Sequence, residues 1–274
     1  LGVTAQELFL ECVFGYPNIH SIEDVCSEIG LSSEVAAALS YMFAGDGNSF
    51  FLREHQKQAL STSLKAGLRE ERNVIVTSGT GSGKTESFLL PIFARLLRER
   101  LGGSAAPDYH WWEEKLEVGD RWSGLRSNQD PSAFALRSMI LYPTNALVED
   151  QLSRLRQAAL RCSKMFGRPL FYFGRYTGAT RGGTEFPQGE LNKSRSGRCN
   201  DLGKELKSEV ELQNTLRERD LDVRGQFSVP LAGEMINRWD MIEAPPDILI
   251  TNTSMLNLML MRELEAPIFD KTRH

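Results

Sequence analysis

The spacing of hydrophobic and polar positions changes near residue 50. Over residues 4–44, apolar residues recur at helical spacing, with a break at Gly30 and a new start behind the serines at 32–33. Serine directly before such a run is a common helix N-cap. The pattern predicts a small helical region over residues 1–48.

After residue 50, short apolar runs alternate with helical stretches. The runs are rich in β-branched and aromatic residues and cover residues 73–77, 138–142, 170–173 and 247–251. Strands that alternate with helices are typical of βαβ units. We therefore predict an α/β domain over residues 49–274, with a parallel sheet flanked by helices.

Two long stretches interrupt this pattern, at about residues 102–136 and 181–245. Both exceed the usual length of a connection in a compact domain, and the second is rich in Gly, Arg, Glu and Lys. We expect these two insertions to form lids, partner surfaces or mobile loops. The pair Trp111 and Trp112 is expected to pack inside the first insertion rather than to stack on a base.

The composition is that of a globular protein, with 25% charged and 41% hydrophobic residues. No apolar run approaches the roughly 20 residues of a membrane-spanning helix, and no basic and apolar leader opens the sequence. The four cysteines are scattered, without metal-ligand spacing. These features favour a cytoplasmic protein without a membrane partner.

The net charge of −4 is unevenly distributed. Residues 1–52 contain seven acidic residues and no Lys or Arg, which leaves about +3 for the rest of the chain. A helical region without cations is poorly suited to bind DNA phosphates. We therefore favour a docking or structural role for residues 1–48, through which protein partners could bind.

A glycine-rich segment follows the first predicted strand, in the sequence VIVTSGTGSGKTESFLLPI at residues 74–92. Glycines allow backbone amides to approach a phosphate at a helix N-terminus. Lys84 is expected to bind the β and γ phosphates of ATP and Thr85 to bind Mg²⁺, which makes them the candidate catalytic residues. The candidate nucleotide-binding residues here are Ser78, Gly79, Thr80, Gly81, Ser82, Gly83, Lys84, Thr85 and Glu86.

Upstream of this loop lies the string FLREHQKQAL, which adds Arg53 and Gln56 to the nucleotide-binding candidates. A glutamine side chain both donates and accepts, so Gln56 could pair with one edge of adenine. Gln56 stands 28 residues before Lys84. The ordinary alternative is a glutamine on a helix surface.

Downstream, three predicted strands end in small polar residues. The first ends in Pro143-Thr144-Asn145 and opens a helix, so free amides and the Thr144 hydroxyl could meet a phosphate. The segments YTGAT and ILITNTSML place Thr177, Gly178, Thr251 and Asn252 in similar positions.

Taken in order, Gln56, TGSGKTE, YPTNALVEDQ, YTGAT and PDILITNTSML resemble the first RecA-like domain of superfamily 2 DEAD/DEAH-type helicases. The segments YPTNALVEDQ and ITNTSMLNLMLMR are most similar in sequence to the MrfA/YprA-like branch, which includes helicases of DNA repair and anti-phage defence. The resemblance covers residues 50–274 without the two insertions. It implies an ATP-driven DNA helicase or translocase. The residues that it places along the DNA backbone are Pro143, Thr144, Asn145, Thr177, Gly178, Thr251 and Asn252.

A basic run follows the first of these loops. Residues 152–181 contain seven Lys or Arg and no Asp or Glu. The seven are Arg154, Arg156, Arg161, Lys164, Arg168, Arg175 and Arg181. Such a run is commonly a solvated helix face, but beside phosphate-binding loops we favour contact with DNA. Charge reversal of Arg154 and Arg156 is predicted to weaken DNA binding for all sequences alike.

The acidic pair with which this family hydrolyses ATP is missing, because no apolar run in the chain ends in Asp-Glu. In similar sequences the pair follows a stretch like IFDKTRH, where this sequence stops. We expect the pair and a second RecA-like domain to lie outside this chain, so that the chain alone has little or no ATPase activity. It is then a fragment, a split subunit or a non-hydrolysing module.

Two rival functions remain. A P-loop kinase would account for residues 74–92 and leave Gln56 and the three polar strand ends without a role. A non-enzymatic scaffold would bind nucleotide, DNA or partners without turnover. Loss of ATP binding in a Lys84→Ala variant would support the helicase, whereas unchanged partner binding with no affinity for nucleotide would favour the scaffold.

Overall fold

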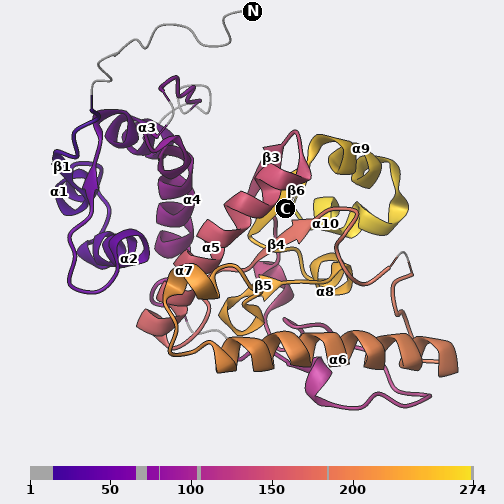
Figure 1. The fold of residues 1–274 in the computed structure, drawn as a ribbon. Helices are drawn as coiled ribbons and strands as arrows, with labels where there is room; N and C mark the ends of the chain where they lie inside the picture. The colour runs from indigo at the N-terminus through magenta and orange to yellow at the C-terminus, as the bar shows by residue number, and fades with distance from the viewer. Residues whose placement is uncertain (1–14, 66–72, 80, 104–105, 184, 273–274) are drawn as a thin grey trace, which may run out of the picture.

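The computed structural model describes residues 15–65, 73–79, 81–103, 106–183 and 185–272 (Figure 1). The helical prediction for residues 4–14 and the candidate Thr80 lie outside these residues. Within them, the chain has a parallel sheet flanked by helices and preceded by a helical N-terminal region, as predicted.

Two helices form the N-terminal region, α1 (Ile22–Glu28) and α2 (Ser33–Ala44). Each begins with a serine that accepts a hydrogen bond from an amide of the first turn, namely Ser21 from Asp24 and Ser32 from Val35. Gly30 separates them with a φ of 74°. A short antiparallel pair, β1 (His20–Ser21) with β2 (Phe51–Leu52), ties the region to the start of α3 (Glu54–Leu64).

The strand predicted at residues 73–77 is not formed. This segment pairs with no described strand, and Ile75 is 91% exposed. A hollow of about 830 Å³ separates Val74 and Val76 from the start of β3 (Ser138–Tyr142). A strand requires a neighbour for its backbone groups, and β3 pairs on one side only, with β6 (Ile248–Asn252).

Four strands form the sheet, in the order β3-β6-β4-β5, and all neighbours are parallel. The remaining two are β4 (Phe173–Tyr176) and β5 (Glu234–Met235). The prediction for β3 matches its bounds, and that for β6 is one residue early. The strand predicted at 170–173 begins three residues too early, because residues 170–172 are buried as coil before the pairing begins.

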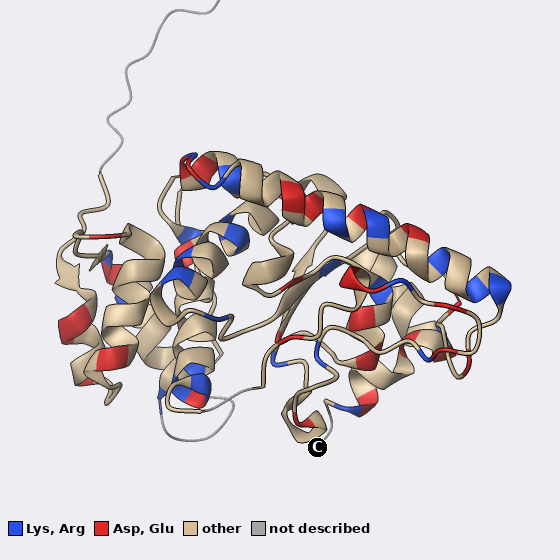
Figure 2. Cartoon of the chain, turned by 90° about the horizontal axis from the view of Figure 1, so that it is seen from below, with Lys and Arg blue, Asp and Glu red and all other residues tan. Residues whose placement is uncertain are grey.

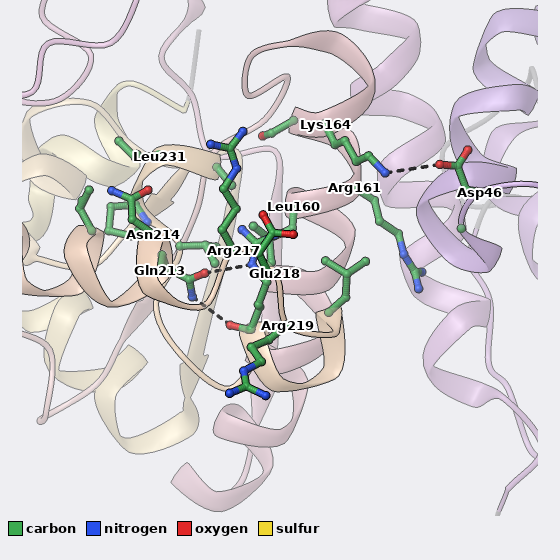
Figure 3. A pocket seen from close by; sticks show the side chains of 18 of the residues that line it. Asp46, Leu160, Arg161, Lys164, Gln213, Asn214, Arg217, Glu218, Arg219 and Leu231 are labelled. Carbon is green, nitrogen blue, oxygen red and sulfur yellow. Dashed lines mark hydrogen bonds and ion pairs between the residues drawn. The ribbon is translucent and has the colours of Figure 1, made fainter.

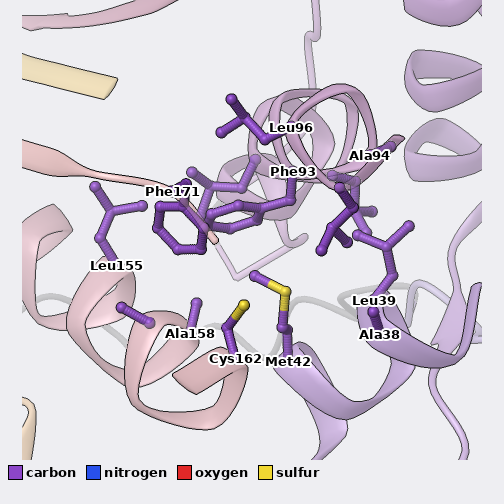
Figure 4. Close-up of a cluster of buried hydrophobic side chains, with 14 of the residues drawn as sticks. Ala38, Leu39, Met42, Phe93, Ala94, Leu96, Leu155, Ala158, Cys162 and Phe171 are labelled. Atoms are coloured by element: carbon purple, nitrogen blue, oxygen red, sulfur yellow. The ribbon is translucent and has the colours of Figure 1, made fainter. Parts of the chain in front are cut away.

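Alternate residues of the sheet face two different cores. Ile248 and Ile250 face a cluster that includes α2, α4 (Lys84–Arg100) and α5 (Asn145–Phe166). Figure 4 shows Met42 of α2, Phe93 of α4 and Cys162 of α5 meeting there. The N-terminal helices therefore share a core with the helix that follows the glycine-rich loop.

The other face of the sheet is covered by the two insertions. The first contributes Trp111, Trp112 and Trp122, and the second contributes α6 (Lys193–Thr215), α8 (Arg238–Glu243) and Trp239. Trp111 and Trp112 are buried, as expected. The expectation of mobile loops is wrong for these described residues, because apolar side chains of both insertions pack into one core.

Shorter elements complete the described chain. They are η2 (Trp111–Glu113), η3 (Pro131–Ala133), α7 (Leu221–Arg224), η4 (Pro230–Ala232), α9 (Thr253–Met261), η5 (Glu263–Glu265) and α10 (Ala266–Asp270). Among the helices of the described residues, none has the length and apolar character that crossing a bilayer requires.

Candidate functional site

The glycine-rich loop runs directly into the first turn of α4, as the sequence predicts. Gly83 is the residue before the helix and has a φ of 78°, which favours glycine. A Cβ at this position would meet Gln56 Nε2 at 2.4 Å. Glycine is therefore needed at position 83 for both its conformation and its close neighbour.

Gln56 and Arg53 hold the loop from the side of α3. Gln56 is 4% exposed; its Oε1 accepts from the amide of Arg53 at 2.9 Å, and its Nε2 donates to the Gly83 carbonyl at 3.0 Å. The Arg53 guanidinium donates to the Gly81 carbonyl at 2.8 Å. Both polar ends of Gln56 are thus engaged inside the chain, and it would have to release a partner to read adenine.

Tyr16 also contacts the loop, and the sequence analysis did not anticipate it. Its hydroxyl accepts a hydrogen bond from the amide of Gly79 at 3.0 Å. Its ring lies edge-on to His55 at 5.7 Å and beneath the Arg53 guanidinium at 5.9 Å. Because Tyr16 stands 40 positions before Gln56, no local sequence pattern indicates this contact.

Some polar groups of the loop bond to one another, and others have no described partner. Lys84 is exposed, and its ammonium donates to the carbonyls of Ser78 at 2.8 Å and Gly79 at 2.6 Å. The amides of Gly81, Ser82 and Gly83 donate to no described residue. A helix N-terminus with free amides and a nearby ammonium is suited to bind phosphate.

Glu86 connects this loop to the next helix along the sheet. Its carboxylate accepts from the Arg154 guanidinium at 2.7 Å, and Arg154 lies on α5. α5 in turn begins at the exposed tip of β3. One ion pair therefore joins the helix of the glycine-rich loop to the helix of the first polar strand end.

The tips of β3 and β6 lie side by side and remain open. Pro143, Thr144 and Asn145 are exposed, and the Thr144 hydroxyl does not cap its own helix. Asn252 donates to Asn145 at 2.6 Å, and its Oδ1 accepts from the Met255 amide at the start of α9. Two helix N-termini, those of α5 and α9, thus meet at one edge of the sheet.

Two of the predicted DNA contacts do not fit the structure. Thr251 is fully buried, and its hydroxyl donates to the Tyr176 carbonyl at 2.6 Å. Thr177 is 2% exposed, and its amide donates to the Thr180 hydroxyl. The Thr251 hydroxyl joins β6 to β4, whereas the Thr177 amide closes a local turn with Thr180. Gly178, next to Thr177, is exposed.

The cations of residues 152–181 also form ion pairs or hydrogen bonds with other groups of the protein. Arg156 is buried against Glu234, and Arg161 donates to the carbonyls of Met42 and Phe43. The remaining pairs are Arg154 with Glu86, Lys164 with Asp46, Arg168 with the Gly103 carbonyl, Arg175 with Glu149, and Arg181 with Glu205 and Glu209. The interpretation of the whole run as a DNA grip is therefore wrong for Arg156, which is an internal contact.

Comparison with known proteins agrees with this arrangement. The family described as DEAD/DEAH box helicase matches residues 53–170, which extend from Arg53 through the loop and α5. Residues 53–170 therefore resemble a DEAD/DEAH box helicase domain. The chain is also 30% identical over 263 residues to Druantia protein DruE of Escherichia coli (strain UMEA 4076-1). That similarity covers 80% of this chain and 13% of DruE, and no solved structure matches the chain.

Proposed function

We propose that the chain is the ATP-binding part of an ATP-dependent DNA helicase or translocase. The observation that carries this proposal is the Glu86–Arg154 ion pair between α4 and α5. It places the candidate nucleotide loop and the candidate strand-binding edge on two directly connected helices. A motor needs such a link between the nucleotide and the strand that it moves.

The residues of the loop fit a triphosphate. The amides at 81–83 and the Lys84 ammonium supply the donors, and Lys84 exchanges two carbonyl partners for phosphate oxygens when ATP binds. The Thr85 hydroxyl would hold Mg²⁺, which neutralises the phosphates when bound. Among the described residues, no group of three or more His, Cys, Asp or Glu could hold a metal.

The base would lie on the α3 side of the loop. Gln56 and Arg53 both touch the loop there, and the Tyr16 ring lies beside them. Adenine recognition by Gln56 requires it to give up its bond to the Gly83 carbonyl or to the Arg53 amide. Binding of the base would then release the loop at the moment when the phosphates enter it.

The DNA strand would lie across the open tips of β3 and β6. Thr144, Asn145 and Asn252, with the amides of two helix N-termini, contact phosphates and no base edge in this arrangement. Gly178, which follows β4, has no side chain and would allow the DNA backbone to come close there. Contacts of this kind do not depend on sequence, as a translocating protein requires.

The cellular role is proposed from the similar sequences. Similarity to Druantia protein DruE supports the anti-phage defence branch over DNA repair. The chain spans 13% of the length of that relative. The carboxylate pair and the arginines for hydrolysis are expected outside this chain, so the chain alone should hydrolyse ATP weakly.

Binding of ATP tests the nucleotide site. In Lys84→Ala, the loss of a charge-assisted hydrogen bond, worth about 1.5–3 kcal/mol, should weaken ATP binding at least about tenfold. Isothermal titration of ATP with Mg²⁺ measures this. The matched control is Lys204→Ala, which removes an exposed lysine from α6. Equal affinity for ATP in both variants would refute the assignment.

Binding of a single-stranded oligonucleotide tests the strand edge. Thr144→Glu places a negative charge where we expect a phosphate, so affinity should fall several-fold for every base sequence. Fluorescence anisotropy with two oligonucleotides of different sequence measures this. Ser208→Glu, at an exposed position of α6, adds the same charge elsewhere. A loss confined to one sequence would argue against a backbone track.

A non-hydrolysing scaffold is the second candidate. It is favoured by the closed state of the loop, in which Lys84 binds two loop carbonyls and Tyr16 occupies the amide of Gly79. If the unmodified chain bound no ATP at millimolar concentration, this alternative would replace the motor.

A further inference from the structure

A hollow of about 660 Å³ lies far from the glycine-rich loop and from the strand edge. It opens between the C-terminal ends of α2 and α5 on one side and the turn from α6 to α7 on the other (Figure 3). Arg161 lies about 16 residues along α5 from Asn145, or roughly 24 Å at 1.5 Å per residue. The hollow is therefore separate from both sites described above.

The lining of this hollow is strongly basic. It contains five cations, namely Arg161, Lys164, Arg217, Arg219 and Arg224, and two carboxylates, those of Asp46 and Glu218. Lys164 pairs with Asp46 at 3.4 Å, as the dashed line in Figure 3 shows. Arg161 is occupied by two carbonyls at the end of α2.

Arg217 and Arg219 lie in the turn between α6 and α7, and Arg224 is the last residue of α7. These three, here called the α6–α7 arginines, lack such partners. No carboxylate of the described residues lies within ion-pair distance of Arg217, Arg219 or Arg224. Burial lowers the pKa of Arg224 and the charge of Arg217 lowers it further, whereas the Glu218 carboxylate acts in the opposite direction. Like charges that are partly removed from water repel each other, and a bound anion relieves this cost.

The end of α7, which carries Arg224, is held against α6 by a buried side chain. Gln213 is 7% exposed, and its Nε2 donates to the carbonyls of Arg224 at 2.9 Å and Phe227 at 3.2 Å. Its Oε1 accepts from Arg224 Nε at 3.5 Å. The Arg224 guanidinium is thus oriented by the fold, which reduces the entropy lost when it binds a ligand.

The shape and chemistry of the hollow fit a phosphate-bearing ligand. A guanidinium presents paired N–H groups that match the oxygens of a phosphate. The lining also contains apolar residues that could cover a sugar or base, namely Leu160, Leu221, Val229, Pro230 and Leu231. The volume lies in the range of small-ligand sites, about 300–1,000 Å³.

We propose that this hollow binds nucleotide phosphate, either of a free nucleotide or of a nucleic-acid strand, on the α6–α7 arginines. The proposal does not depend on the glycine-rich loop, because no residue of that loop lines the hollow. It gives the second insertion and the N-terminal helices a joint role, since both supply walls of the same site.

The test compares two double variants of equal charge in the full chain. Arg217→Ala with Arg219→Ala removes two exposed arginines of the turn, and Lys193→Ala with Lys204→Ala removes two exposed lysines of α6. The probes are ADP, in a Lys84→Ala background that weakens the loop, and a single-stranded 12-mer of thymidine. Titration at several salt concentrations gives the affinity for each.

We expect the arginine variant to lose tenfold or more in affinity for at least one probe. Its salt slope for the 12-mer should fall by about one to two, while the lysine variant stays unchanged. A loss for ADP alone identifies a free nucleotide, and a loss for the 12-mer alone identifies a strand. Unchanged affinity for both probes, or an equal loss in the lysine variant, overturns the proposal. The arginine double variant is also tested with Lys84 intact. If it still binds ATP, the glycine-rich loop is unaffected, and the loss measured above belongs to the hollow alone.

Discussion

The basic run at residues 152–181 and the α6–α7 arginines have the same kind of charge and differ in their partners. Every cation of the run has an acceptor inside the protein, many of them from distant segments. Among the described residues, no carboxylate forms an ion pair with Arg217, Arg219 or Arg224, although the Glu218 carboxylate interacts with Arg224. Figure 2 shows acidic and basic residues interspersed over the helices, so a local count of charge does not reveal which cations are available.

The two groups of cations differ in what they must give up to bind a ligand. A cation that is already paired must break its ion pair before it can bind a phosphate, and a buried one must also be exposed to water. The exposed pair of Arg154 with Glu86 can exchange at little cost, whereas the buried pair of Arg156 with Glu234 cannot. Burial and pairing, rather than charge alone, decide which arginines are available to a ligand.

The largest change in stability is expected at the buried ion pair of Arg156 with Glu234. Arg156→Ala leaves Glu234 buried without its two hydrogen bonds of 2.9 and 2.7 Å, which should lower the free energy of unfolding by about 3–5 kcal/mol. Urea denaturation measures this change. Replacing both partners by alanine should cost less than Arg156→Ala alone, and a single-variant loss under about 1 kcal/mol would contradict a structural role.

The second largest change in stability is expected at Glu243, a half-buried carboxylate. Burial raises the pKa of Glu243 from its ordinary 4.5 to about 7, with a further contribution from the carboxylate of Asp240. Burial also raises the pKa of Asp240, to about 6. Glu243 Oε2 has no hydrogen-bond partner, and the Lys271 ammonium beside it donates to the Glu243 carbonyl.

A raised carboxyl pKa means that the folded state favours the protonated form. The stabilising contribution is complete below the ordinary pKa of 4.5 and is lost as the pH rises through 7. We expect the free energy of unfolding to increase as the pH falls from 8 to 5. Glu243→Gln should remove part of this dependence and stabilise the protein by about 1–2 kcal/mol at pH 8.

Urea denaturation of Glu243→Gln at pH 8, 6.5 and 5 measures the dependence. The control is Glu263→Gln, which neutralises an exposed carboxylate. If Glu243→Gln and the control showed the same pH profile, the burial of Glu243 would have no energetic consequence.

The smallest change in stability is expected at the exposed ion pair of Arg154 with Glu86. Arg154 is 47% exposed as a side chain, so Arg154→Ala should change the free energy of unfolding by no more than about 1 kcal/mol. If Arg154 binds DNA, the same variant should still lower affinity for the single strand. A stability loss as large as that of Arg156→Ala would remove the distinction between the two arginines.

The fold class and much of the nucleotide loop could be predicted from the sequence. The proposed phosphate site at residues 81–86 consists of adjacent backbone amides and side chains, so their spacing alone predicts such a loop at a helix start. The serine caps at 21 and 32 and the bounds of β3 are likewise local features. Helical and alternating apolar patterns depend on residues a few positions apart.

The tertiary structure decided what depends on distant segments. The Arg156–Glu234 pair joins residues 78 positions apart, and the Tyr16 contact with Gly79 joins residues 63 positions apart. The burial of Thr177 and Thr251 follows from the neighbours of their strands, and the shared core of the two insertions from packing over the sheet. Sequence alone determines local backbone geometry and the kind of chemistry available, whereas burial and pairing are properties of the folded chain, because they depend on groups that only folding brings together.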